Sequence, residues 1–289
     1  MAMIRSRTSL VSLALLLIFG VTISELSLSQ STVLAQEAGR DTVFTAPVET
    51  NKQQELAVLY QSLIEDYGTK ARVFSLNRAQ WQSLQTLRSL EEAVTATTAV
   101  LVARDKTMIT YFELLLGVLE KTPGIELTLK QQSKDALTAR IQWLQLHEQQ
   151  SLQSVDRDSV NARSDEYRQA SDLIGTEAQY ALMLVRLGQL QTTFDRANGL
   201  YGRILERNKS NPSTPTQEIE RERAYTQVGI LKDSIQSDLT LARNSLDPQT
   251  AERGKIEESY ASFISRLESP YSKTYKYLSY LEELALDTW

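Results

Sequence analysis

The chain has 289 residues, a single histidine, no cysteine and a formal net charge of −5. The lack of cysteine excludes disulfides, thiol nucleophiles, cysteine-based zinc sites and a lipid anchor on an N-terminal cysteine. The mild acidity, spread along the chain, argues against binding to nucleic acid. A chain of this length can still bury enough apolar surface to be stable by packing alone.

The first 35 residues have the three-part layout of a secretory signal peptide. Arg5 and Arg7 precede an apolar run from Leu10 to Ile23, and Val33-Leu34-Ala35 resembles a cleavage site. The apolar run is shorter than the roughly 20 residues that a membrane-spanning helix needs. We therefore predict an exported, extracytoplasmic protein, secreted or associated with the cell envelope, that is cleaved after Ala35. A long polar spacer before that site leaves an uncleaved N-terminal anchor as the alternative.

The rest of the chain is predicted to be helical almost throughout. Residues 36–50 are polar and aperiodic, and we expect them to form a flexible lead-in to a helical bundle domain over residues 51–289. No segment shows the sustained alternation of β-branched residues that is typical of a strand. The expected helices cover residues 51–87, 90–121, 127–152, 159–207, 217–246 and 248–287.

Caps, prolines and glycines mark the expected helix ends. Ser89 and Glu92 fit a capping box at the start of the second helix, and Thr122-Pro123-Gly124 ends it. Residues 208–216 form the one clear loop, whereas residues 154–158 give only a soft break. In the last helix, which Asp247-Pro248 begins, Pro270 predicts a kink or a break.

Apolar residues recur every three or four positions along three of these helices. That spacing is typical of a coiled-coil seam, in which side chains of one helix pack into holes on its neighbour. We therefore predict an all-α fold, an elongated bundle of about five or six long helices with coiled-coil-like packing. The seam positions are Ala57, Tyr60, Ile64, Tyr67, Ala71, Phe74, Arg78 and Trp81, then Tyr180, Met183, Leu187, Leu190, Phe194, Ala197, Tyr201 and Ile204, and finally Tyr260, Phe263, Leu267, Tyr277, Leu281 and Leu284.

No residue pattern predicts a catalytic, cofactor-binding or metal site. His147 has Trp143 and Leu144 where a second metal ligand on the same helix would stand, so we expect a surface or half-buried histidine without a metal. Residues 156–161 resemble a calcium loop but lack its glycine, so helix capping is the better interpretation. Phosphate-binding and dinucleotide-binding glycine motifs and a serine nucleophile turn are also missing, so we predict that the protein is not an enzyme.

Two further segments leave a choice between packing and binding. Residues 100–119 are rich in apolar side chains but contain charges, which favours a buried central helix over a membrane-inserting one. Tyr271, Tyr275, Tyr277 and Tyr280 form a C-terminal cluster that either packs in the core or binds a partner.

The sequence favours an exported, non-enzymatic helical bundle that acts as an envelope scaffold or protein-interaction module. Its expected partners are proteins of the envelope, and it would touch the membrane only through an uncleaved N-terminal segment. The alternative is a membrane-anchored bundle that binds a ligand or senses one. The sequence does not determine the oligomeric state.

Overall fold

The protein is an all-α bundle, as the sequence predicts. The computed structural model describes residues 48–209, 214–246 and 256–286; these residues contain six helices and no strand. The predicted signal peptide, nearly all of the lead-in, and Asp247-Pro248 lie outside the described residues. The helices are α2 (Val48–Leu84), α3 (Leu87–Lys121), α4 (Leu127–Leu152), α5 (Arg157–Lys209), α6 (Pro215–Asn244) and α7 (Ile256–Leu286).

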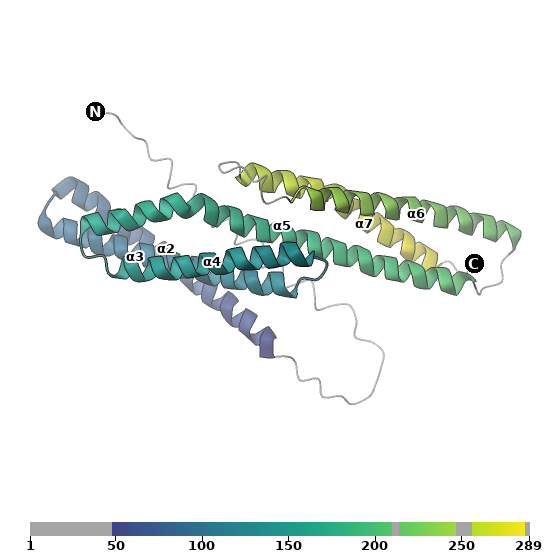
Figure 1. The fold of residues 1–289 in the computed structure, drawn as a ribbon, viewed down its shortest axis with the longest axis horizontal. Coiled ribbons are helices and arrows are strands. Elements are labelled where there is room, and N and C mark those ends of the chain that lie inside the picture. Colours follow the sequence, from purple (N-terminus) through teal and green to yellow (C-terminus); the bar gives the residue numbers. More distant parts are fainter. Residues whose placement is uncertain (1–47, 210–213, 247–255, 287–289) are drawn as a thin grey trace. The chain divides into compact units, whose positions relative to one another are not determined.

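The long helix α5 joins two sets of helices. It has 53 residues, which at 1.5 Å per residue gives a length of about 80 Å. Its first half packs on α3 and α4, and α2 packs on α3, whereas its second half packs on α6 and α7 (Figure 1). The bundle therefore has two packed regions that share one continuous helix.

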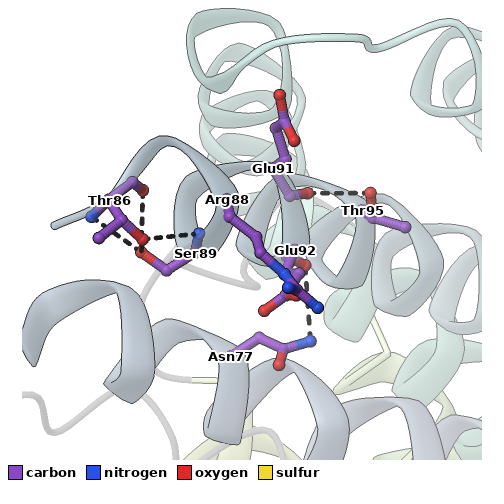
Figure 2. A network of polar contacts seen from close by, with 7 residues as sticks. All are labelled: Asn77, Thr86, Arg88, Ser89, Glu91, Glu92 and Thr95. Carbon is purple, nitrogen blue, oxygen red and sulfur yellow. Dashed lines mark hydrogen bonds and ion pairs between the residues drawn. The ribbon is translucent and has the colours of Figure 1, made fainter. Parts of the chain in front are cut away.

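The turn between α2 and α3 differs from the prediction. The N-cap of α3 is Thr86, not Ser89; the Thr86 side chain accepts a hydrogen bond from the backbone of Ser89, and the Ser89 hydroxyl bonds back to the Thr86 backbone (Figure 2). The side chain of Glu92, expected in the capping box, instead pairs with Arg88 at 3.0 Å. Gln85 adopts φ +50°, a left-handed conformation that turns the chain sharply enough for α3 to begin three residues early.

The connection before α4 was predicted correctly, and the break after α4, which the sequence left open, is present. α3 ends at Lys121, and Gly124 in the following loop adopts φ +76°, which suits glycine. The soft break is a real one at residues 153–156. There the carboxylate of Asp156 accepts a hydrogen bond from the backbone N–H of Ser159 at 2.8 Å. Hydrogen bonds with the backbone and the side chain of Ser159 lower the pKa of this carboxyl. Asp156 is thus a helix cap, as expected for the calcium-like segment.

Of the kink or break predicted at Pro270, the break does not occur, because α7 runs through this residue without interruption. Its apolar seam residues Phe263, Leu267, Tyr277, Leu281 and Leu284 are all buried. A proline removes one backbone hydrogen bond, but burial on both sides of Pro270 holds the helix together.

The seam positions of α2 and α5 face neighbouring helices, except that Arg78 is exposed. Residues 100–119 of α3 form a buried central segment, as predicted, with Phe112 and Leu119 fully buried. Among the described helices, none is both long and apolar enough to span a bilayer. Packing of the coiled-coil type stays a prediction.

Candidate functional site

The only histidine of the chain lies in the interior of the bundle. His147 on α4 is just 2% exposed, so the expectation of a surface or half-buried side chain is wrong. Its Nδ1 lies 2.6 Å from Oδ2 of Asp105 on α3, and its Nε2 lies 2.9 Å from the backbone carbonyl oxygen of Arg163 on α5. The imidazole can be buried because both nitrogens find a partner on a neighbouring helix.

Aromatic and cationic side chains enclose this pair. The indole of Trp143 stacks on the imidazole, with ring centroids 5.1 Å apart. The guanidinium carbon of Arg104 lies 3.1 Å from the centroid of the Tyr167 ring, and one of its nitrogens lies 3.5 Å from Oδ1 of Asp105. We call these five side chains the histidine cluster: Arg104, Asp105, Trp143, His147 and Tyr167.

The surroundings of the histidine cluster favour the charged form of the imidazole. Burial lowers the pKa of His147, but the hydrogen bond and negative charge of Asp105 raise it. The carbonyl of Arg163 raises it further, and the nearby charge of Arg104 opposes this. The balance leaves the pKa of His147 above its ordinary value of 6.5.

The histidine cluster offers no free base to a substrate. Both ring nitrogens of His147 are engaged inside the bundle, whereas a general base must reach the proton that it abstracts. In the part of the chain that the structure describes, no three His, Asp or Glu side chains are placed to hold a metal ion. The cluster joins three helices around a buried charge.

No specific sequence pattern indicated the pairing of His147 with Asp105. The two residues are 42 positions apart, and Asp105 stood out only as a charge within the apolar segment 100–119. The one available clue was general: a carboxylate on a buried helix needs a partner, and a lone histidine on an adjacent helix is a suitable one.

The C-terminal tyrosines divide between the core and the surface. Tyr277 is fully buried, and its hydroxyl lies 2.9 Å from Oδ1 of Asn198 on α5. Tyr275 is 78% exposed and Tyr271 42% exposed, and Leu278 lies on the same side of α7. We call Tyr271, Tyr275 and Leu278 the tyrosine face. Core packing thus applies to Tyr277, whereas partner binding by the exposed tyrosines stays a prediction.

The first half of the bundle also has an open groove with a volume of about 570 Å³. It lies between α2, α3 and the connection from α4 to α5, and most of its lining residues come from α3. Its rim carries Lys70 paired with Asp66, and Lys106 paired with Glu148, each at 3.7 Å. The apolar residues that line it are Val94, Ala99, Val102, Ala103, Leu152 and Val155.

No protein-family model matches the sequence, and no curated protein or solved structure shows significant similarity to it. The function therefore has to be inferred from the chain's own residues.

Proposed function

We propose that the protein is an exported, non-enzymatic helical bundle that acts as an interaction module in the cell envelope. The observation that carries the proposal is the tyrosine face, which leaves two large aromatic side chains on the surface of a well-packed helix. Aromatic rings of this kind supply a large contact area at low entropic cost and are frequent at the centres of protein interfaces.

The occupant that fits the tyrosine face best is an amphipathic helix of a partner protein. Tyr271, Tyr275 and Leu278 are spaced by four and three residues, which is the spacing of a helix–helix seam. On its other side, α7 already uses the same kind of spacing, where Tyr277 packs against Phe194 with ring centroids 6.0 Å apart. A partner helix would cover the exposed stripe as α5 covers the buried one.

The histidine cluster supports the non-enzymatic part of the proposal. His147 has both nitrogens bonded within the bundle, and the side chains around it hold it in place. A buried imidazole whose two nitrogens are both hydrogen-bonded stabilises the packing of the helices. The function would then depend on the exposed surface of the bundle.

The groove favours a second candidate function, a membrane-anchored bundle that binds a small ligand. Its lining is mostly apolar with two lysines at the rim, a composition that ligand sites between helices share. Its wide opening to solvent makes it the weaker candidate. Copurification of a small molecule that the groove-filling change Ala99→Trp displaces would favour this function.

The test is site-specific photo-crosslinking in the native envelope. With a photoreactive residue in place of Tyr275, one protein partner should be crosslinked and identified. Tyr271→Ser combined with Tyr275→Ser should lower its capture at least tenfold, corresponding to about 1.4 kcal/mol of binding free energy. Because both side chains are partly or largely exposed, these changes should leave the fold intact.

Ile230→Ser combined with Leu241→Ser provides the matched control, because these apolar residues are exposed on α6. The control should capture the partner as well as the unchanged protein does. Equal capture by the tyrosine variant, or equal crosslinking from position 230, would contradict the role of the tyrosine face.

A further inference from the structure

The hydrogen bonds of His147 require two protons. Its Nδ1 faces a carboxylate oxygen and its Nε2 faces a carbonyl oxygen, and neither oxygen has a proton of its own to donate while the carboxylate is ionised. A neutral imidazole carries one proton only. In one neutral tautomer the unprotonated nitrogen would face the Asp105 carboxylate at 2.6 Å; in the other it would face the Arg163 carbonyl at 2.9 Å.

Each neutral tautomer would thus place two lone pairs against each other inside the bundle. Turning the ring over about its Cβ–Cγ bond would put carbon atoms where the two nitrogens lie, and neither hydrogen bond would then form. A second proton removes the repulsion and turns both contacts into charge-assisted or ordinary hydrogen bonds. The observed arrangement is therefore the arrangement of the protonated pair.

We propose that His147 is a pH-operated latch that ties α4 both to α3 and to α5 only while its imidazole is protonated on both nitrogens. When the second proton leaves, one of the two links must break. Loss of the Arg163 link leaves the hydrogen bond from the Arg163 side chain to Gln150 as the contact between Arg163 and α4. Loss of the Asp105 link leaves a fully buried carboxylate with Arg104 as its remaining partner at 3.5 Å.

The other charged and titratable groups around the latch do not produce the same response. The charged side chains are Arg104 on α3, which lies beside Asp105, and Arg163 on α5, which pairs with Glu166. Burial raises the pKa of Tyr167 to about 12, and Tyr67 of α2 contributes to that shift. The adjacent ion pair between Lys106 of α3 and Glu148 of α4 is solvent-accessible at the lysine.

The direction of the effect follows from the raised pKa of His147. A group whose pKa is higher in the folded state stabilises that state fully below its ordinary pKa, here 6.5, and loses the contribution as the pH rises through the folded value. The latch is therefore closed in mildly acidic solution and opens toward alkaline pH. This inference does not depend on the proposed interaction function.

The test is an NMR titration of the histidine ring in the untagged protein labelled with ¹⁵N and ¹³C. Because His147 is the only histidine, its ring signals need no assignment by mutation. We expect both nitrogens to be protonated at pH about 6.5, where a free histidine is half-charged, and a midpoint at a higher pH. Above the midpoint, backbone amides in residues 153–167 should lose protection against hydrogen exchange, after correction for the intrinsic rate.

Asp105→Asn is the matched variant. Its amide can donate to a neutral Nδ1 while Nε2–H donates to Arg163, so both links can survive deprotonation. We expect a midpoint about one pH unit or more below that of the unchanged protein, and no loss of protection with rising pH. A midpoint at or below 6.5 in the unchanged protein, or unchanged protection across its midpoint, would overturn the latch.

Discussion

Replacing Asp105 with leucine is expected to lower the free energy of unfolding by about 3–5 kcal/mol, as measured by urea unfolding near pH 6. The side chain of Asp105 is fully buried and is the acceptor for Nδ1 of His147. Its removal leaves Nδ1 of His147 and the Arg104 guanidinium without their carboxylate. Removing one member of a buried pair exposes the full cost of having taken the other out of water.

The double change of Asp105→Leu with His147→Leu separates the pair from simple loss of packing. Because it removes both partners, it should cost clearly less than the sum of the two single changes. Asp66→Ala serves as the control, since Asp66 forms an exposed pair with Lys70 at 3.7 Å and should cost no more than about 1 kcal/mol. A cost for Asp105→Leu as small as that of the control would mean that the buried pair does not stabilise the fold.

Substitution of two glycines in the same helix should have opposite effects on stability. Gly188 and Gly199 both belong to α5. A Cβ on Gly188 would lie 2.8 Å from the carbonyl oxygen of Pro123 and 2.4 Å from a side-chain carbon of Ile125, so the loop from α3 to α4 would have to move. We expect Gly188→Ala to lower the free energy of unfolding by about 1–3 kcal/mol.

Gly199→Ala should instead raise the free energy of unfolding by about 0.5–1 kcal/mol, because alanine reduces the entropy that a helix position loses on folding. No atom lies within 4 Å of a Cβ placed on Gly199. Both free energies are measured by urea unfolding. Both changes replace glycine with alanine in the same helix, so only the atoms that surround the new Cβ differ. A rise in the free energy of unfolding for Gly188→Ala, equal to that for Gly199→Ala, would show that the loop does not pack closely on Gly188.

Local sequence signals located most of the helices. They gave the wrong helix start where two capping patterns overlapped. Both ends of α4 were predicted exactly, because a Thr-Pro-Gly turn precedes it and a polar break follows. At the start of α3, Thr86 and Ser89 provide a capping pair of their own, three residues before the Ser89–Glu92 pattern. Local pattern alone does not decide between two such caps, since the turn at Gln85 and packing on α2 select one.

The candidate sites depend on contacts between distant residues, which periodicity does not specify. The spacing of Tyr271, Tyr275 and Tyr277 correctly places them on two sides of the helix. Tyrosine suits either a buried or an exposed side, so only packing against α5 decides that Tyr277 is covered. The pairing of His147 with Asp105 requires the relative register of α3 and α4. That register is set by many small side-chain contacts along both helices.

The most direct test of the functional account is the N-terminus and location of the protein in its native cell. The signal-like first 35 residues are the basis for placing the bundle in the envelope. Mass spectrometry of the protein purified from the extracytoplasmic fraction should give a chain that begins at Gln36. A chain that keeps residues 1–35 and stays in the cytoplasm would contradict export, and an envelope-bound chain that keeps them would replace the released bundle with an anchored one.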